Sequence, residues 1–325
     1  MEEYPIKNKR VLITGGAGVI GRELLKLLIE RGANILSVDR HPLPRGSLRG
    51  VLHIQKNLAT DSLVELRDFR PHIIFHLAAA FERSKESSEF WSTNWHDNLL
   101  LSHRIVDLTR EMSNLEVFVF ASSYLVYSPS LYLSPSLRED VVYLKEDSPI
   151  APRNLCGAAK YYTERELEFV KEVLNPSLRI ICARIFRVYG CGSRDVISRW
   201  VRAGFSGQDI EVYNKQNRFD FVFARDVAEG LLRFVETRDA QGLVNLGSGI
   251  ARSIQDVLDL LIERIPTVRL KIRDLGIMEP FEASCADLTI LKRLTGWAPP
   301  TSLEKGIEMV IEFERNRISQ GVVHG

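Results

Sequence analysis

Short apolar runs alternate with amphipathic stretches through the first 190 or so residues of the chain. Six runs rich in Val, Ile, Leu and Phe have the length of buried strands. They are Arg10–Thr14, Asn34–Asp39, Val51–Gln55, His72–Leu77, Val117–Ser122 and Leu178–Ile185. Apolar residues at three- and four-residue spacing predict helices at Val19–Glu30, Ser62–Phe69, Glu89–Glu111 and Leu155–Val173. This βαβ rhythm predicts an α/β fold, a Rossmann-type doubly wound parallel sheet with helices on both faces.

The second half of the chain has a less regular pattern. Val196–Ala203 and Ile254–Ile265 have helical spacing. Phe221–Phe223 and Leu243–Leu246 are short apolar runs, which we expect to be strands that return to the main sheet.

These differences predict two lobes. We expect residues 1–188 and 219–249 to form the Rossmann domain, and residues 189–218 and 250–325 to form a smaller α/β lobe that binds substrate at the carboxyl edge of the sheet. Ser128–Pro152, rich in Ser and Pro, is predicted to be a long functional or mobile loop.

Composition narrows the classes of function. Lys and Arg number 43 and Asp and Glu number 42, so the net charge is +1, which argues against a nucleic-acid or membrane-surface binder. We see no apolar run that could span a bilayer and no apolar signal core. The four cysteines have no metal-ligand spacing, so reduced thiols in a cytoplasmic protein and no bound metal are expected.

A glycine-rich segment between the first strand and the first helix indicates a dinucleotide site. Gly15 allows the tight turn, Gly18 lets the backbone approach a pyrophosphate, and Gly21 lets the helix pack closely. The helix N-terminus then stabilises the phosphate charge. Asp39 ends the second strand, where its carboxylate would accept both ribose hydroxyls and repel a 2′-phosphate. The spacing predicts NAD, and the neighbouring Arg40 leaves NADP as a minor alternative.

Asn57 and Leu58 follow the third strand. Both are well placed to touch adenine, although Asn57 could equally cap a turn.

Several segments, in the expected order, resemble the extended short-chain dehydrogenase/reductase family, whose members mostly act on nucleotide sugars. The matching segments are Thr14–Gly21 (TGGxGxxG), His76–Ala79 (HLAA), Ser122–Tyr127 (SSxxVY), Arg184–Gly190 (RxxNVYG), Asp220–Val227 (RDFxxVxDV), Asn245–Gly249 (NxGxG) and Leu294–Pro299 (LGWxP). The resemblance implies NAD as cofactor, a nucleoside-diphosphate sugar as substrate, and a homodimer formed through the helices at Glu89–Glu111 and Leu155–Val173.

With the resemblance included, the expected cofactor contacts come from the strand ends and from Lys160. They are Gly15, Gly18, Val19, Ile20, Gly21, Asp39, Arg40, Asn57, Leu58, Leu77, Ala78, Ala79 and Lys160.

The family's Tyr-x-x-x-Lys pair is altered here. Lys160 and the catalytic Ser123 are present, but Cys156 holds the position of the tyrosine base. Three explanations stay open. The thiol of Cys156 acts as the base, Tyr124 supplies a phenol, or redox catalysis is lost or greatly slowed and the protein binds cofactor and nucleotide sugar in another role.

The residues after Ser123 narrow the reaction. Related sugar dehydratases carry Asp-Glu where this chain has Tyr124 and Leu125, and leucine cannot do acid/base chemistry. Epimerase-like oxidation and re-reduction of one sugar carbon therefore fits better than dehydration. The rival hypotheses are a catalytically silent binding protein and an NAD-dependent reductase of a non-sugar carbonyl.

Arginines are the expected contacts for the substrate's diphosphate because the planar guanidinium can bond two oxygens. The candidates are Arg184, Arg187, Arg194, Arg218 and Arg225. Arg218 is the best single candidate, and Arg187 stands where the family has Asn. Ser123, Tyr124, Arg187 and Arg218 are therefore the predicted substrate-binding residues.

Overall fold

The computed structural model describes residues 5–43, 50–81, 87–265, 270–276 and 280–319. No helix among these residues is both long and apolar enough to cross a membrane.

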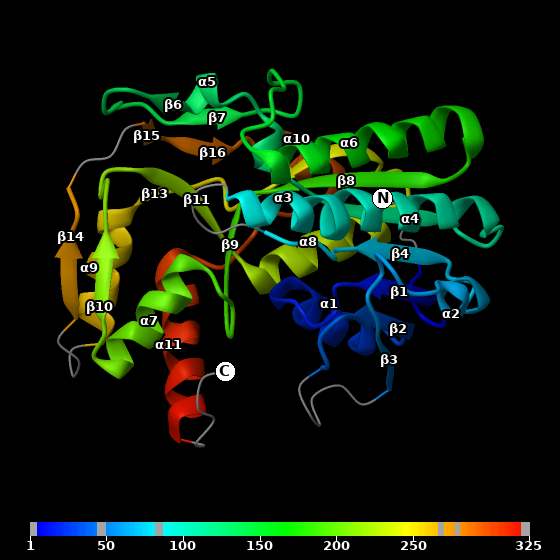
Figure 1. The fold of residues 1–325 in the computed structure, drawn as a ribbon, viewed down its shortest axis with the longest axis horizontal. Coiled ribbons are helices and arrows are strands. Elements are labelled where there is room, and N and C mark those ends of the chain that lie inside the picture. Colours follow the sequence, from blue (N-terminus) through cyan, green and yellow to red (C-terminus); the bar gives the residue numbers. More distant parts are fainter. Residues whose placement is uncertain (1–4, 44–49, 82–86, 266–269, 277–279, 320–325) are drawn as a thin grey trace.

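A seven-stranded parallel sheet forms the centre of the larger part of the molecule (Figure 1). Its spatial order is β12 (Gly242–Leu246), β8 (Arg179–Ile185), β5 (Val117–Ser123), β4 (Ile73–His76), β1 (Arg10–Thr14), β2 (Asn34–Asp39) and β3 (Val51–Gln55). The predicted doubly wound sheet is confirmed, and the run Leu243–Leu246 does return to it as β12.

Alternating residues of each strand enter two different cores, because successive side chains of a strand point to opposite faces. In β1, Val11 and Ile13 join one core while Leu12 joins the other. Helices α1 (Val19–Glu30) and α8 (Ala224–Glu236) supply leucines and valines to the first core. The other face is covered by α4 (Leu101–Leu108) and α6 (Leu155–Phe169), with the short α2 (Val64–Asp68) at its edge (Figure 1).

The helix predicted over Glu89–Glu111 forms, but in pieces. It begins as α3 (Ser88–Asn94), widens to a π-helical turn at Trp95–Leu100, continues as α4, and ends in a 3-10 turn at Thr109–Glu111. Asn98 lies in the π-helical turn, and its side chain donates to Asn94 Oδ1 (2.8 Å) and accepts the backbone N–H of Ala80 (2.8 Å). The predicted helix over Leu155–Val173 likewise ends in a π-helical turn, at Val170–Leu174.

A third core lies in the smaller part of the molecule. Helices α7 (Val196–Ser206), α9 (Ile254–Arg264) and α11 (Leu303–Ser319) pack there against short strands. These are the pair β10 (Asp209–Val212) and β14 (Lys271–Asp274), and the sheet β13 (Ala251–Ser253), β11 (Arg218–Phe223) and β9 (Arg187–Tyr189).

The prediction that Phe221–Phe223 returns to the main sheet is wrong. These residues pair with Arg187–Tyr189 in β9 instead. Phe219, Phe221 and Phe223 are buried in the third core, so their apolar side chains pack in the smaller part of the molecule.

The segment Ser128–Pro152 contains more structure than a loop. It forms α5 (Pro129–Tyr132), β6 (Leu133–Ser134) and β7 (Val142–Leu144). Strand β6 pairs with β15 (Phe281–Glu282), and β7 pairs with β16 (Ser284–Ala286), which precedes α10 (Thr289–Thr295). The pairing places residues 281–286 beside the segment that follows β5.

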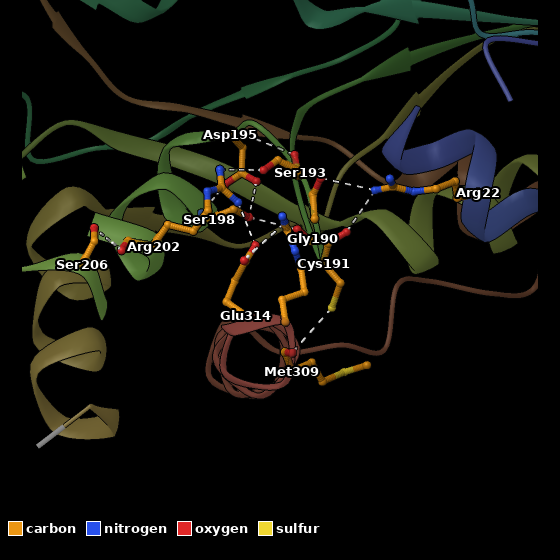
Figure 2. A network of polar contacts seen from close by, with 12 residues as sticks. Arg22, Gly190, Cys191, Ser193, Asp195, Ser198, Arg202, Ser206, Met309 and Glu314 are labelled. Atoms are coloured by element: carbon orange, nitrogen blue, oxygen red, sulfur yellow. Dashed lines mark hydrogen bonds and ion pairs between the residues drawn. The ribbon is translucent and has the colours of Figure 1, made fainter. Parts of the chain in front are cut away.

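Polar contacts tie the first helix to the smaller part of the molecule (Figure 2). Arg22 on α1 donates to the carbonyl oxygens of Cys191 and Gly192, both at 3.3 Å. Arg202 on α7 pairs with the buried Glu314 of α11 at 2.7 Å and donates to the carbonyl oxygen of Ser193 at 2.8 Å. The loop between β9 and α7 is therefore held from both sides.

Candidate functional site

The glycine-rich loop leaves room only for backbone at the start of α1. Gly15 has a φ of 78°, and a Cβ there would lie 2.7 Å from the backbone nitrogen of Ala78. A Cβ at Gly21 would overlap the carbonyl oxygen of Gly15. A Cβ at Gly18 would meet Gly15 O alone, at 3.2 Å. The loop is thus a bare backbone cradle at a helix N-terminus, which fits a pyrophosphate; Val19 and Ile20 form the first helical turn beside it.

Asp39 lies at the end of β2 against this loop. Its Oδ2 accepts the N–H of Ala17 at 3.0 Å, and its Oδ1 accepts the N–H of His41 at 2.9 Å. Each carboxylate oxygen has a second lone pair for a ribose hydroxyl. Arg40 is drawn away into a 2.7 Å ion pair with Asp97, so the arginine that kept NADP as an alternative already has an anionic partner.

Asn57 makes the turn that was one of its two predicted roles. Its Oδ1 accepts the N–H of Ala59 at 3.0 Å, and its N–H donates to Asp61. Leu58 is buried in the core beneath. The contact of either residue with adenine stays a prediction.

The strand ends beneath the loop are fixed by a buried histidine. His76 shares hydrogen bonds with Thr14 Oγ1 (2.7 Å) and Ser102 Oγ (3.0 Å). Burial lowers the pKa of His76 to about 3, so the ring is neutral at neutral pH. The backbone of Leu77 and Ala78 donates to Thr14, and Ala79 follows as an exposed residue. The His76–Ala79 segment is therefore held beside Gly15.

Cys156 and Lys160 lie in the first turns of α6. Lys160 is buried, and its Nζ is 4.7 Å from the centroid of the Phe120 ring. The Cys156 thiol is also buried and faces the carbonyl oxygen of Ala80 at 3.9 Å. Burial raises the pKa of the Cys156 thiol and lowers the pKa of the Lys160 amine. Burial thus shifts both groups toward their neutral forms.

Ser123 closes β5 beside this helix. Its Oγ accepts the N–H of Leu125 at 3.2 Å. A Cβ at Gly157 would overlap the carbonyl oxygen of Leu125, and the same oxygen accepts the N–H of Arg153 at 2.9 Å. The glycine after Cys156 thus lets the start of α6 pack directly on the turn that follows Ser123.

Tyr124 is held in place by partners of its own. Its ring stacks on Phe186 with centroids 5.1 Å apart, and its hydroxyl donates to Glu282 Oε1 at 3.3 Å. Burial raises the pKa of Tyr124 to about 12. The phenol is protonated at neutral pH and already hydrogen-bonded to a carboxylate.

The predicted arginines fall into different environments. The prediction that Arg184 contacts the diphosphate is wrong. Its guanidinium is fully buried and donates to both oxygens of Glu164, at 3.0 and 2.8 Å. Arg184 therefore holds β8 to α6. Arg194 is exposed, and Arg225 is an exposed partner of Glu23.

Arg218 borders a hollow of about 450 Å³. Its guanidinium donates to the carbonyl oxygen of Glu139 at 2.8 Å. Lys215, Arg252 and Asp256 line the same hollow. Lys215 pairs with Asp274 and Arg252 pairs with Glu304, both at 2.7 Å. The hollow has the size for part of a nucleoside diphosphate, and Arg218 is the predicted diphosphate contact that lines it.

The sequence pattern missed Glu282. Its carboxylate is buried in β15, yet it accepts from Tyr124, from Arg153 (2.5 Å), from Ser284 (3.1 Å) and from Arg187 (3.5 Å). The signal that could have found it is one acidic residue within the otherwise apolar and small run 281–286, because a lone buried carboxylate needs partners.

Most of the chain matches one protein-family model. Residues 11–247 match the model of the family described as "NAD dependent epimerase/dehydratase family". The chain belongs to this family. It is thus an epimerase/dehydratase-type protein with NAD as its cofactor, in accord with the glycine cradle and Asp39.

Relatives of this epimerase/dehydratase family member act on nucleotide sugars. The chain is 27% identical to UDP-glucuronic acid decarboxylase 4 of Arabidopsis thaliana, over 95% of this chain and 69% of that protein. It is 25% identical to a putative UDP-glucose 4-epimerase of Methanocaldococcus jannaschii, over 94% and 98%. The structure of MoeE5 in complex with UDP-glucose and NAD superposes with a TM-score of 0.81 at 28% identity, over 95% and 99%. MoeE5 has also been solved with UDP-glucuronic acid and NAD, with a TM-score of 0.82 over 94% and 99%.

Proposed function

We propose that this chain is an NAD-dependent nucleotide-sugar epimerase-like enzyme that oxidises and re-reduces one sugar carbon of a UDP-sugar. The observation that supports the proposal is the packing of Gly157 on the turn after Ser123, because Gly157 belongs to the first turn of α6, the helix that carries Cys156 and Lys160. The glycine cradle and Asp39 support NAD at the adjoining strand ends. The relatives' nucleotide sugars support the substrate class.

Each residue has a defined task in this proposal. The loop at Gly15–Gly21 and the N-terminus of α1 bind the pyrophosphate, and Asp39 binds the adenine ribose. Ser123 donates a hydrogen bond to the reacting sugar oxygen, and Lys160 binds the second ribose. Bound NAD supplies the hydride acceptor. Cys156 stands where the hydroxyl proton must be received.

Proton transfer is the weak step. A base works best with a pKa near the working pH, but burial raises the pKa of the Cys156 thiol. Burial also lowers the pKa of Lys160, and this disfavours the positive charge that would stabilise a thiolate at Cys156. We therefore expect turnover well below that of a tyrosine-bearing relative. The same observation favours a second candidate, a silent protein that binds NAD and nucleotide sugar without converting them.

The hollow at Arg218 is proposed to hold the diphosphate and its nucleoside. Arg218 lines this hollow beside Lys215 and Arg252, which pair with Asp274 and Glu304. The carboxylate of Asp256 accepts the backbone N–H of Ser253. A guanidinium is well suited to phosphate oxygens. Arg218 is the residue whose loss should weaken UDP binding most.

We also propose a cytoplasmic homodimer. Trp91, Trp95, Phe169 and Val173 are more than half exposed on α3, α6 and the π-helical turns that continue them. Exposed large apolar side chains on neighbouring helices support a protein–protein interface at this face. Helices α4 and α6 lie side by side there, linked by His103 and Glu166 at 2.5 Å (Figure 1).

In the test, the protein is incubated with a panel of UDP-, GDP- and dTDP-sugars. The epimeric products are resolved enzymatically and then detected by mass spectrometry. Absorbance at 340 nm reports NADH. The parent chain is run beside Cys156→Tyr and Cys156→Ser. We expect slow conversion of a UDP-sugar by the parent, a gain of about 10²-fold or more in Cys156→Tyr, as general-base catalysis contributes, and loss in Cys156→Ser.

The other outcomes separate the rival functions. Binding of UDP-sugars by the parent with activity only in Cys156→Tyr would establish the silent binding protein. NADH oxidation by small ketones without binding of any nucleoside diphosphate would establish the non-sugar reductase and overturn the proposal.

A further inference from the structure

Two arginines share one buried carboxylate next to the proposed sugar site. Arg153 Nη1 lies 2.5 Å from Glu282 Oε2, and Arg187 Nη2 lies 3.5 Å from the same oxygen. The Glu282 side chain is 2% exposed, whereas those of Arg153 and Arg187 are 29% and 37% exposed. The carboxylate is therefore at the bottom of the cluster, and the two guanidiniums lie between it and solvent.

The charges of this cluster do not balance among the described residues. Two guanidiniums face one carboxylate, and the two phenols beside them, Tyr124 and Tyr132, are neutral at neutral pH because burial raises their pKa. Positive charge in a mostly buried setting is costly without an anion. One positive charge therefore has no counterion from the described chain.

Unused hydrogen-bond donors accompany the unbalanced charge. Arg187 lies flat on the Phe219 ring, its Cζ 3.7 Å from the centroid. Its Nε is buried and has no partner within the described part of the chain. A guanidinium carries five N–H donors in a planar fork. The 3.5 Å ion pair of Arg187 with Glu282 engages only the Nη2 nitrogen. The buried Nε of Arg187 is thus short of an acceptor, and the cluster is short of negative charge.

The chain positions this pair at the sugar end of the site. Tyr124, which donates to Glu282, directly follows Ser123. Arg153 lies three residues before Cys156 and is bound by its N–H to the carbonyl oxygen of Leu125. The hollow proposed for the nucleoside diphosphate has its own cations, Lys215, Arg218 and Arg252; Arg153 and Arg187 do not line it.

We propose that Arg153 and Arg187 form a subsite for a carboxylate on the sugar, so that the substrate is a nucleoside-diphosphate uronic acid. This rests on the proposed function and names its substrate class. A planar carboxylate can take two parallel N–H bonds from a guanidinium, and it supplies the missing negative charge. Glu282 is a positioning residue that holds both guanidiniums. MoeE5, at 28% identity, is a structural neighbour solved with UDP-glucuronic acid.

The experiment compares a matched pair of ligands that differ only in this group. Isothermal titration calorimetry on the NAD-loaded protein measures UDP-glucose, UDP-glucuronic acid and UDP with the parent, Arg187→Asn and Arg153→Gln. We expect the parent to bind UDP-glucuronic acid at least about tenfold more tightly than UDP-glucose, as one additional charge-assisted hydrogen bond implies. Both variants should lose that preference and keep the parent's affinity for UDP. Arg218→Gln is the matched control, with weaker binding of all three ligands and the preference retained.

Three results would contradict the carboxylate subsite or the proposed function on which it rests. Equal affinity of the parent for the two sugars overturns the carboxylate subsite. A fall in UDP affinity in Arg187→Asn and Arg153→Gln that matches their fall for UDP-glucuronic acid assigns the pair to the diphosphate and overturns it too. Failure of the parent to bind UDP or either UDP-sugar contradicts the proposed function itself. The parent's preference is measured without any variant, so a variant that misfolds leaves the test intact.

Discussion

Cys156 and Lys160 are one helical turn apart on α6, and burial acts on both in the direction of the neutral form. In a thiol–amine pair of this kind, ionisation of one group would stabilise the charge of the other. A bound substrate that brings negative charge to the reacting oxygen would favour the protonated amine of Lys160. The acid/base state of the pair therefore depends on what is bound beside it.

The lowered pKa of His76 predicts how the free energy of unfolding depends on pH. Its folded pKa of about 3 lies below the ordinary value of 6.5, because burial and then the charge of Lys160 disfavour the imidazolium. The unfolded chain therefore takes up the proton first, and the unfolding free energy falls as the pH drops below 6.5. From pH 6.5 to pH 5 the loss should be about 2 kcal/mol, measured by urea unfolding.

The variant His76→Gln isolates this contribution. It should be less stable than the parent at pH 7.5 but should lose about 2 kcal/mol less between pH 6.5 and 5. The exposed His96 serves as the control through His96→Gln. An identical pH slope in the parent and His76→Gln would show that His76 does not carry the effect.

At the residue scale, sequence reasoning found positions whose chemistry is local. Gly15, Gly21 and Asp39 belong to one strand–turn–helix–strand unit, so their spacing alone indicates a dinucleotide loop. Glu282 could not be found this way, because its partners Tyr124, Arg153 and Arg187 come from segments about 95–158 residues away in the chain. Arg184 was misjudged since its buried partner Glu164 lies on a neighbouring helix.

At the element scale, strand β8 and helix α6 are joined by a buried ion pair. Arg184 and Glu164 have side chains that are 2% and 3% exposed and lie 2.8 Å apart. Ser122 donates to the same carboxylate at 2.5 Å. The pair connects the strand next to Ser123 with the helix that carries Lys160.

Removing one partner of the Arg184–Glu164 pair should lower the free energy of unfolding markedly. Glu164→Gln leaves the Arg184 charge buried without its counterion, so we expect the unfolding free energy to fall by about 3–5 kcal/mol, measured by urea denaturation. The control is Glu168→Gln on the same helix, which breaks the exposed pair with Arg165 and should change stability by less than about 1 kcal/mol. The double variant Glu164→Leu/Arg184→Met should be more stable than Glu164→Gln. Equal losses in Glu164→Gln and Glu168→Gln would contradict the buried-pair argument.

The elements of the main sheet were predictable because each contains a short run of apolar residues, and β1, β2 and β3 are each followed by a glycine or a charged residue. Strands β1, β2 and β3 and helix α1 have the predicted bounds. The strands β6 and β7 were not predictable, since they are two and three residues long and pair with residues 281–286, far along the chain. Phe221–Phe223 was misplaced because an apolar run does not reveal which of two cores it enters. Local pattern determines an element, whereas its partner depends on distant residues.

At the scale of the whole molecule, the exposed apolar side chains on α3 and α6 predict self-association. Trp91 is 70% exposed and Phe169 is 56% exposed. We expect size-exclusion chromatography with light scattering to give about twice the chain mass of 37.0 kDa for the parent. Trp91→Glu/Phe169→Glu should elute as a monomer, because a charge in an apolar interface is desolvated without a partner.

Leu52→Glu is the control for this measurement. Leu52 is 59% exposed on β3, at the other edge of the sheet, so this variant should remain a dimer. A parent chain that is monomeric, or a double variant that stays dimeric, would refute the proposed interface.

The order in which the sheet is completed has a consequence for biosynthesis. Strand β8 ends at Ile185, but β12, which pairs with it at the rim of the sheet, begins only at Gly242. At roughly 5–20 residues per second, a ribosome takes about 3–11 s to make the chain between them. For that time the nascent sheet presents β8, an apolar strand with unpaired backbone groups, as its open edge. Such edges invite pairing with other chains, so the newly made protein is most vulnerable to aggregation before residue 246 has emerged, and slower synthesis lengthens that interval.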